Sequence, residues 1–440
     1  MAHPYIPLTD DDRQAMLSTI GVASTDDLFT EIPAAYRDPV FDLPAALSEA
    51  ELLREMSALA GKSTSDLPSF LGAGAYRHFI PSTVAHIVNR GEYLTAYTPY
   101  QPEISQGTLQ TAFEFQSLVC ELTGMEVANS GMYDGASALA EACLMACSVS
   151  GRDRILLLDT IHPHIIETVR TYAAGRGHEV QVVPATDATV SDGDACLAVQ
   201  QPNFFGYLED LQSLGEAAHE SGALFIVSAD PVSLGLYKPP AEFGADIVVG
   251  DGQPLASPPN FGGPYVGLFA CRQQYQRHMP GRIAGRTTDL DGRTGYVLTL
   301  QTREQHIRRE RATSNICTST QLIALAFTVA LTTLGKQGLR QMAELCYQKA
   351  HYAAAQIAAL PGYELANSPS TGSGQAFFQE FVVQCPLSPE EVNRRLLEQG
   401  MIGGYDVSDR IDNGLLLCFS ELHTREEIDR LVETLGAING

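Results

Sequence analysis

The stretch LFIVSADPVSLGLYKPPAEFGADIVVGDGQPLASPPNFGGPYVGLFA, residues 224–270, decides the fold of this chain. It contains three short apolar runs, LFIVSAD, DIVVGD and YVGLFA, which are separated by segments rich in Gly and Pro. Apolar runs of roughly four to eight residues with such flanks are typical of buried β-strands. The first two runs end in Asp230 and Asp251, so we expect a carboxylate at the end of each strand.

The same pattern extends outward from this stretch, over residues 112–270. Strand-like runs (RILLLD, EVQVVP, ACLAVQ) alternate there with amphipathic segments such as HPHIIETVRTYAAGRG and YLEDLQSLGEAAHESG. Strands that are apolar almost throughout and alternate with helices indicate a sheet covered on both faces. We therefore predict an α/β fold with a large, doubly wound and mainly parallel sheet.

Three regions are expected along the chain. Residues 1–66 form an N-terminal helical segment, in which Thr9 and Ser24 have the spacing of helix N-caps. Residues 67–318 form the large α/β domain. Residues 319–440 form a long linking helix and a small α+β domain, with strands FFQEFVVQC and GLLLCFSE and helices SPEEVNRRLLEQG and TREEIDRLVETLGAI.

Composition excludes several classes of protein. Apolar residues make up 45% of the 440 residues, which indicates a globular protein. The net charge of −24 argues against a nucleic-acid partner, because phosphate contacts require clustered Lys and Arg. No apolar run approaches the roughly 18–20 residues of a membrane span, and no signal peptide is recognisable. Nine cysteines without a CxxC pair fit the reducing cytoplasm.

No metal site is predicted. His162, His164 and Glu167 lie close together in the sequence, but such residues at a helix start are more often ordinary polar positions. Cys143 and Cys147 stand one helical turn apart, and in an apolar helix they are best interpreted as buried small residues.

The segment NSGMYDGASALAEACLMA, residues 129–146, suggests an anion-binding turn. Ser130, Tyr133, Asp134 and Gly135 lead into a helix of small residues, whose first N–H groups can approach an anion closely. In an α/β fold this turn lies at the carboxyl end of the sheet, where ligands bind. A tight turn before a packed helix explains the same pattern equally well.

The order of these features resembles the fold type I pyridoxal-phosphate enzymes. In that class a glycine-rich helix start holds the phosphate, a strand-end aspartate faces the pyridine nitrogen, and a lysine after the next strand forms the Schiff base. The resemblance implies a pyridoxal-phosphate-transferase-like large domain. It assigns the cofactor pocket to Ser130, Tyr133, Asp134, Gly135 and Asp230.

The chain resembles one family more closely, the glycine cleavage system P-protein, in its N-terminal half or its separate alpha subunit. The resemblance spans about residues 16–320 and rests on six stretches: MLSTIGVASTDDLFTEIP, FLGAGAYRHFIPS, TAYTPYQPEISQGTLQ, ANSGMYDGASALAEA, VVGDGQPLASPPNFGGPYVG and TREQHIRRERATSNICTS. It implies a glycine decarboxylase that passes the aminomethyl group to the lipoyl group of H-protein.

The lysine pattern departs from that of a complete enzyme of this class. The chain has four lysines, Lys62, Lys238, Lys336 and Lys349, and none lies just past the strand DIVVGD, where the sequence reads DGQPLASPPNFGG. The family then implies that the beta subunit carries the lysine that holds pyridoxal phosphate. We expect the pocket of this chain to be vestigial and the isolated chain to be inactive.

The loop TAYTPYQPEISQG is the best candidate for a shared site with the beta subunit. Its polar side chains suit a small zwitterion such as glycine: Tyr97, Tyr100, Gln101, Glu103, Ser105 and Gln106. A buried interface loop is an equally good interpretation. Two other functions remain open, an independent pyridoxal-phosphate-dependent amino-acid decarboxylase or lyase using Lys238, and a non-catalytic scaffold subunit.

Residues 277–311 contain eight arginines in an otherwise acidic chain. Such a segment could receive an acidic lipoyl carrier protein. Internal pairing with Asp289, Asp291, Glu304 and Glu310 is the simpler expectation.

Overall fold

A computed structural model describes residues 5–37, 39–63, 66–316, 320–367 and 376–438. The chain forms two compact units, Met1–Asp66 and Leu67–Gly440. The boundary that the sequence predicts between residues 318 and 319 lies outside the described residues, so the division of the second unit at that point stays a prediction.

The first unit is helical and has little core of its own. Its elements are α1 (Asp10–Ile20), η1 (Thr25–Phe29), η2 (Ala34–Tyr36) and α2 (Glu49–Ala60). Thr9 caps α1, as predicted, and its backbone N–H donates to Asp12 Oδ2 at 2.9 Å. Ser24 begins a 3₁₀ turn instead of an α-helix. Leu17 alone is buried among the apolar residues described here, so these helices depend on local capping.

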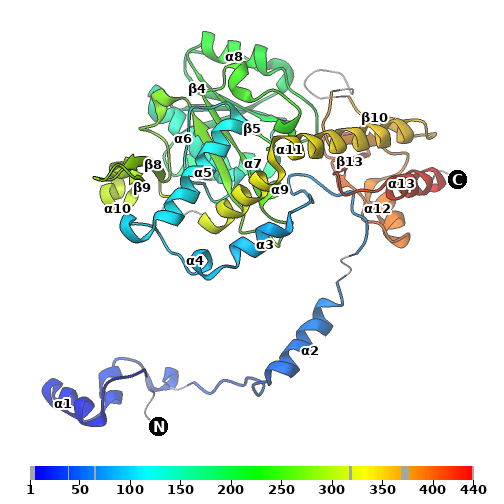
Figure 1. Cartoon of the computed structure of the whole chain (residues 1–440). Helices are drawn as coiled ribbons and strands as arrows, with labels where there is room; N and C mark the ends of the chain where they lie inside the picture. Colours follow the sequence, from blue (N-terminus) through cyan, green and yellow to red (C-terminus); the bar gives the residue numbers. More distant parts are fainter. Residues whose placement is uncertain (1–4, 38, 64–65, 317–319, 368–375, 439–440) are drawn as a thin grey trace. The chain divides into compact units, whose positions relative to one another are not determined.

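A seven-stranded sheet forms the centre of the second unit, in the order β1-β7-β6-β5-β4-β2-β3 (Figure 1). The strands are β1 (Val127–Ala128), β2 (Arg154–Leu158), β3 (Glu179–Val183), β4 (Asp194–Gln201), β5 (Leu224–Ala229), β6 (Ile247–Asp251) and β7 (Gly267–Cys271). Strands β2 to β6 pair in parallel, and β7 runs antiparallel to both of its neighbours. The predicted mainly parallel sheet is thus confirmed.

Helices cover both faces of this sheet (Figure 1). They include α5 (Gln106–Thr123), α6 (Gly135–Ser150), α7 (Pro163–Ala174) and α8 (Leu211–Glu220). Successive side chains of one strand enter different cores. Leu156 packs in a core with Phe115 of α5, whereas Leu157 packs in a core with Val169 of α7. This alternation makes the unit doubly wound, because each strand must satisfy two helical layers.

The long helix α11 (Gln321–Ala358) links the large sheet to the smaller one. It bends at Gly335, whose φ of 62° and ψ of −179° are not helical. By length and composition α11 could cross a membrane. However, Ala324, Phe327 and Ala330 are fully buried against the sheet, which is the environment of a core helix.

A second sheet has the antiparallel order β10-β11-β13-β12 and carries two helices. Its elements are β10 (Glu364–Leu365), β11 (Glu380–Gln384), β12 (Tyr405–Asp406), β13 (Gly414–Cys418), α12 (Pro389–Glu398) and α13 (Arg425–Ile438). The strands β11 and β13 and the helices α12 and α13 are those predicted for the small α+β part of the chain, whereas the two-residue strands β10 and β12 were not predicted.

The arginine-rich segment contains a hairpin that the sequence did not reveal. Strands β8 (Ile283–Thr288) and β9 (Thr294–Thr299) pair antiparallel around Gly292, whose φ is 78°. Their side chains are mostly polar or small, so the sequence has no alternation of apolar residues that would predict these strands. The remaining short elements are α3 (Ser82–Val88), α4 (Gly91–Leu94), η3 (Pro102–Ile104), η4 (Ala185–Asp187), η5 (Ser233–Gly235), η6 (Pro240–Phe243), α9 (Gln253–Ala256), η7 (Gln273–Tyr275), η8 (Gln301–Arg303), α10 (Gln305–Arg308) and η9 (Arg309–Arg311).

Candidate functional site

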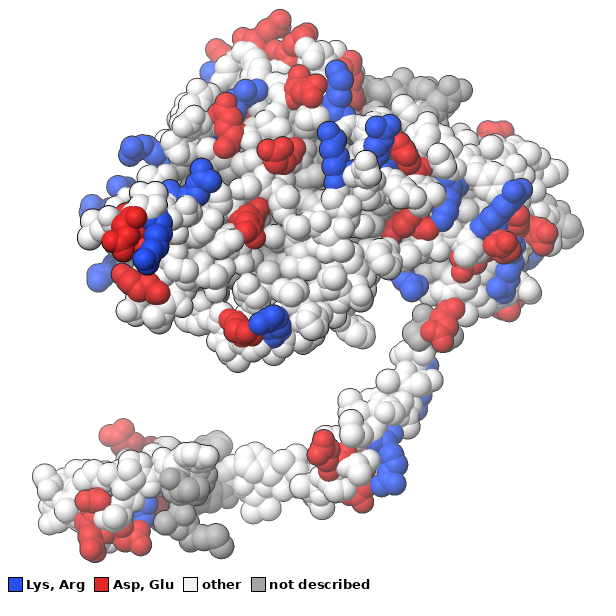
Figure 2. All heavy atoms as spheres, in the orientation of Figure 1, with Lys and Arg blue, Asp and Glu red and all other residues white. Residues whose placement is uncertain are grey.

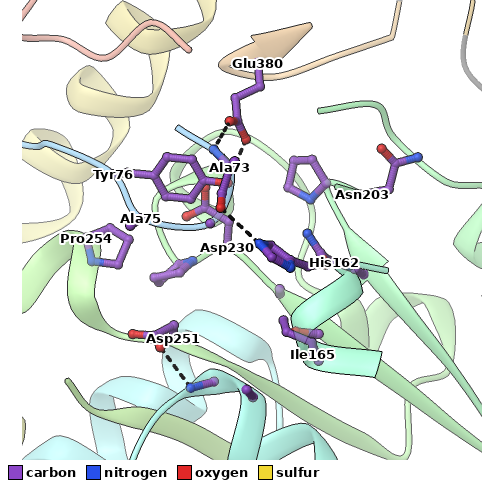
Figure 3. Close-up of a pocket in the computed structure, with 18 of the residues that line it drawn as sticks. Ala73, Ala75, Tyr76, His162, Ile165, Asn203, Asp230, Asp251, Pro254 and Glu380 are labelled. Carbon is purple, nitrogen blue, oxygen red and sulfur yellow. Dashed lines mark hydrogen bonds between the residues drawn. The ribbon is translucent and has the colours of Figure 1, made fainter. Parts of the chain in front are cut away.

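A cavity of about 370 Å³ opens at the carboxyl ends of β4, β5 and β6, and residues of the small sheet close it (Figure 3). This is the place where open α/β sheets bind ligands. Four carboxylates line it: Asp134, Asp230, Asp251 and Glu380. Among the described residues that line the cavity there is no lysine or arginine.

The amino-terminal end of α6 at this cavity is already occupied by carboxylates of the same chain. Asp251 Oδ2 accepts from the N–H of Gly135 at 2.9 Å (Figure 3). Asp134 Oδ1 accepts from the N–H of Ser137 at 2.7 Å. A Cβ at Gly135 would lie 2.9 Å from the Cβ of Asp251, so only glycine allows this approach. Burial raises the pKa of Asp251 to about 6. The anion position predicted for this turn is therefore filled.

Residues 72–76 enter the cavity from the irregular segment before α3. Glu380 holds them: its Oε1 accepts from the N–H of Ala73 and its Oε2 from the hydroxyl of Tyr76, each at 2.7 Å (Figure 3). The carbonyl of Ala73 lies 3.0 Å from Nε2 of His162. Burial raises the pKa of Glu380 to about 7. The cavity is thus narrowed by a segment that is hydrogen-bonded on both sides.

Asp230 follows β5, where an acid can face a cofactor ring. Its Oδ1 accepts from the N–H of Val232 at 2.8 Å, and its Oδ2 accepts from the amide of Gln379 at 3.2 Å. Burial raises its pKa. The carboxylate therefore lies in the predicted place, but both of its oxygens have partners within the chain.

The other two predicted cofactor residues do not line the cavity. Ser130 is buried, and its backbone N–H and its hydroxyl both donate to the carbonyl of Arg282, at 2.8 and 3.1 Å. Tyr133 is partly exposed beside Asp134. Of the five residues, the structure brings together Asp134, Gly135 and Asp230.

Within the second unit, Lys238, Lys336 and Lys349 do not line this cavity. Lys238 is 72% exposed between η5 and η6 and stands 3.7 Å from Glu242. Lys349 donates to the carbonyl of Glu421, and Lys62 and Lys336 are exposed. The geometry therefore disfavours Lys238 as a Schiff-base residue, because it does not face the strand-end carboxylates.

The predicted shared-site loop connects α4 to α5 on another surface. Tyr97 is 78% exposed and Tyr100 is 47% exposed, and the side chains of Gln101 and Glu103 also face outward. Ser105, at the start of α5, is half-buried. These side chains are accessible to a partner.

Gln106 has a different role from its neighbours on the loop. Its amide donates to the carbonyls of Pro102 and Tyr296, and its Oε1 accepts from the N–H of Tyr296 at 2.8 Å. With these bonds the side chain fastens the loop to β9, so this placement favours support of the loop over contact with a ligand.

A second cavity of about 260 Å³ adjoins the loop and includes Tyr97 and Arg282 among its lining residues. Arg282 is buried, pairs with Glu304 at 3.4 Å, and donates to the hydroxyl of Tyr100 at 3.1 Å. His306 packs edge-on against Tyr100. The sequence placed Arg282 and Glu304 in an arginine-rich segment, but no local pattern connected them with the loop 182 residues away from Arg282.

Internal ion pairs account for part of the arginine-rich segment. Besides Arg282–Glu304, Arg293 lies 3.9 Å from Asp291, and Arg311 lies 3.9 Å from Glu310. The two latter pairs are exposed and contribute little energy. The expected internal pairing is thus observed for three of these arginines.

The surface around the loop is poor in charge. Figure 2 shows few charged side chains over α3, α4 and the following loop. Large apolar side chains are exposed there: Phe79, Leu94, Tyr97, Tyr100 and Ile104. An exposed apolar surface of this kind marks a protein interaction site.

The doubly wound sheet, the strand-end cavity and the small α+β part define the fold of the type I pyridoxal-phosphate enzymes. The chain is similar in structure to a Lactobacillus brevis glutamate decarboxylase, with a TM-score of 0.67 and 13% identity over 91% of this chain and 94% of the other. It is also similar to a Burkholderia pseudomallei sphingosine-1-phosphate lyase, with a TM-score of 0.65 and 16% identity over 92% and 93% of the two chains. At these identities the likeness concerns the fold alone.

The chain belongs to the glycine cleavage system P-protein family, whose model matches residues 3–435. It is 52% identical to a probable glycine dehydrogenase (decarboxylating) subunit 1 of Thermomicrobium roseum over 98% of both chains, and 50% identical to that of Desulfitobacterium hafniense over 99% of both. A crystal structure of glycine decarboxylase (P-protein) of the glycine cleavage system, in inhibitor-bound form, is 42% identical, with a TM-score of 0.90 over 99% of this chain and 100% of that chain.

Proposed function

We propose that this chain is the lysine-free subunit of a two-subunit glycine decarboxylase. The observation that carries the proposal is the cavity at the strand ends, where Asp251 occupies the amino-terminal end of α6 and none of the described lining residues is a lysine. Membership of the P-protein family and relatives named subunit 1 support a second subunit.

Pyridoxal phosphate does not fit the cavity of this chain. Its phosphate would need the N–H groups that Asp251 and Asp134 now engage, and it would bring negative charge beside these two carboxylates. Like charges in a buried space repel strongly. The cofactor of the assembled enzyme therefore belongs to the beta subunit and its lysine, where it supplies an electron sink for decarboxylation.

In this proposal, the chain contributes the surface of the 97–106 loop to the site that it shares with the beta subunit. The apolar side chains of Leu94, Tyr97 and Ile104 would be covered by the beta subunit, while the Tyr100 hydroxyl stays available to a ligand. The N-terminal unit adds an exposed apolar row on α2, with Leu52, Met56 and Leu59 at helical spacing.

The complete reaction in this proposal uses glycine as substrate and the lipoyl group of H-protein as acceptor. The complex releases the carboxyl group of glycine as carbon dioxide and transfers the aminomethyl group to the lipoyl disulfide. We place the complex in the cytoplasm, since nine cysteines without a CxxC pair fit a reducing compartment.

Borohydride trapping tests this assignment. Pyridoxal phosphate is added to this chain alone, to the beta subunit alone and to the assembled complex, and each is reduced and measured by mass spectrometry. We expect a pyridoxyl adduct on a beta-subunit lysine and none on this chain. A stoichiometric adduct on Lys238 would overturn the proposal in favour of an independent enzyme.

Exchange of labelled bicarbonate with the glycine carboxyl group gives the matching functional test. We expect exchange from the assembled complex and none from this chain alone. A beta subunit that exchanges equally well without this chain would make the chain a scaffold instead of part of the active site.

A further inference from the structure

A buried ion pair lies beneath the exposed ring of Tyr100. Arg282 is 8% exposed and Glu304 is 8% exposed, and their Nε and Oε2 atoms are 3.4 Å apart. Arg282 Nη2 donates to the Tyr100 hydroxyl at 3.1 Å, and its guanidinium carbon lies 5.3 Å from the centre of the tyrosine ring. The buried Arg282 thus contacts both the buried Glu304 and the exposed phenol of Tyr100.

Arg303, on the same segment, shows how a purely structural arginine is used. It is also buried, and it donates to the backbone carbonyls of Met279, Gly281 and Leu300. Arg282 has no such set: among the described residues its Nε has no hydrogen-bond partner, and neither has Oε1 of Glu304. A buried ion pair is seldom favourable for stability alone, so Arg282 and Glu304 require another explanation.

The donor pattern determines what the Tyr100 hydroxyl can do. A guanidinium group can only donate, so the phenol oxygen accepts the bond from Arg282 and its own proton is left to donate elsewhere. No acceptor for this proton is recorded in the part of the chain that the structure describes. His306, 5.4 Å away centre to centre, restricts the ring, and nearly half of the tyrosine is accessible.

We propose that Arg282 is a positioning residue which fixes Tyr100 as a hydrogen-bond donor to the substrate carboxylate at the site completed by the beta subunit. This inference rests on the proposed function. Of the two charged groups of an amino acid, only the carboxylate accepts hydrogen bonds. Glu304 keeps the guanidinium charge neutralised and oriented, so that Arg282 serves Tyr100 instead of binding the substrate itself.

Kinetics of the assembled two-subunit enzyme test the role of Tyr100. For Tyr100→Phe we expect KM for glycine to rise roughly 10- to 100-fold, with a smaller change in kcat, because a hydrogen bond to a charged group is lost. Methylamine, which has the amine of glycine without its carboxylate, serves as a competitive probe. Its inhibition constant should stay unchanged in Tyr100→Phe.

A double-mutant cycle tests the role of Arg282. Arg282→Met should raise KM for glycine as Tyr100→Phe does, and the double variant should be no worse than either single variant, since both changes remove one interaction. Arg282→Lys should recover part of the loss, because an ammonium group can donate to the phenol. It also keeps the buried charge, should Arg282→Met fail to fold.

Each of these experiments tests a different part of the proposal. If Tyr100→Phe leaves glycine exchange unchanged, the loop is not part of the shared site, and this part of the proposed function fails. If Tyr100→Phe weakens methylamine as much as glycine, the carboxylate assignment fails. If the effects of Tyr100→Phe and Arg282→Met add, Arg282 does not act through Tyr100 and the positioning role fails, while the two-subunit assignment stands.

Discussion

The strand-end cavity and the 97–106 loop differ in how far the chain satisfies its own polar groups. In the cavity, Asp251, Glu380 and Asp230 each accept two hydrogen bonds from the same chain. At the loop, Tyr97 is largely exposed and Arg282 Nε has no hydrogen-bond partner in the described structure. The three carboxylates of the cavity therefore have their partners within the chain, whereas the exposed side chains of the loop are available to a partner.

The largest expected difference between the two regions is in how much stability is lost when a glycine residue is replaced by alanine. A Cβ on Gly206, at the cavity, would lie 2.1 Å from the backbone carbonyl oxygen of Glu380, and the φ of Gly206 is 89°. We expect Gly206→Ala to lower the free energy of unfolding by at least about 3 kcal/mol. Gly107, at the start of α5, has open space around it. Gly107→Ala should be neutral or raise stability by about 0.5 kcal/mol, measured by urea unfolding. Equal losses would contradict the contrast.

The pH dependence of stability should also distinguish the cavity from the loop. The pKa of Glu380 is raised by burial from 4.5 to about 7, so its contribution to stability is present below about pH 4.5 and is lost as the pH rises through 7. Wild type should lose up to about 3 kcal/mol of unfolding free energy over this pH range because of Glu380, and Glu380→Gln should not show this loss. Unfolding curves of both proteins between pH 4 and 8 measure the difference. Parallel curves would mean that the pKa of Glu380 is the same in the folded and unfolded states.

Removing the carboxylate of Asp251 should free an anion-binding site in the cavity. Asp251→Ala frees the N–H of Gly135 at the start of α6 and the N–H of Gln253 at the start of α9. We expect inorganic phosphate to stabilise this variant by about 1–2 kcal/mol. The melting temperature as a function of phosphate concentration measures the effect. Asp210→Ala, which removes the N-cap of α8 away from the cavity, is the matched control and should show no phosphate response. Equal responses of the two variants would refute a specific site.

The smallest effect is expected at Lys238. Its exposed pair with Glu242 at 3.7 Å should contribute no more than about 0.5 kcal/mol, so Lys238→Met should leave unfolding almost unchanged. Glycine turnover by the assembled enzyme should also be unchanged, because Lys238 lines neither region. Loss of turnover in this variant would restore the lysine as a catalytic candidate.

Periodicity explains which elements could be predicted. The strands β2 to β7 and the helices α7, α8, α12 and α13 carry apolar patterns strong enough to be recognised from a single sequence. The hairpin of β8 and β9 was missed because its side chains are mixed and it is held partly by Gln106 of a distant helix. The kink at Gly335 was also missed, since the residues around it continue the helical pattern.

The candidate site was predictable only in part. Asp230, Asp134 and Gly135 were found because strand ends and helix starts have local signals. Glu380 and Tyr76 were not, because the hydrogen bond between them joins residues 304 positions apart. Arg282 was noticed only as one of eight arginines, since nothing in its neighbourhood indicates Tyr100.

The sequence by itself determined that no lysine lies in the segment DGQPLASPPNFGG, just past the strand ending at Asp251, and this is a property of order along the chain. It also determined the α/β class, because the apolar periods of strands and helices are local. Only the tertiary structure decided that Asp251 caps α6, 116 residues earlier, and that Arg282 supports Tyr100. Contacts of this kind depend on strand order and on how the helices pack, and residue spacing does not specify either.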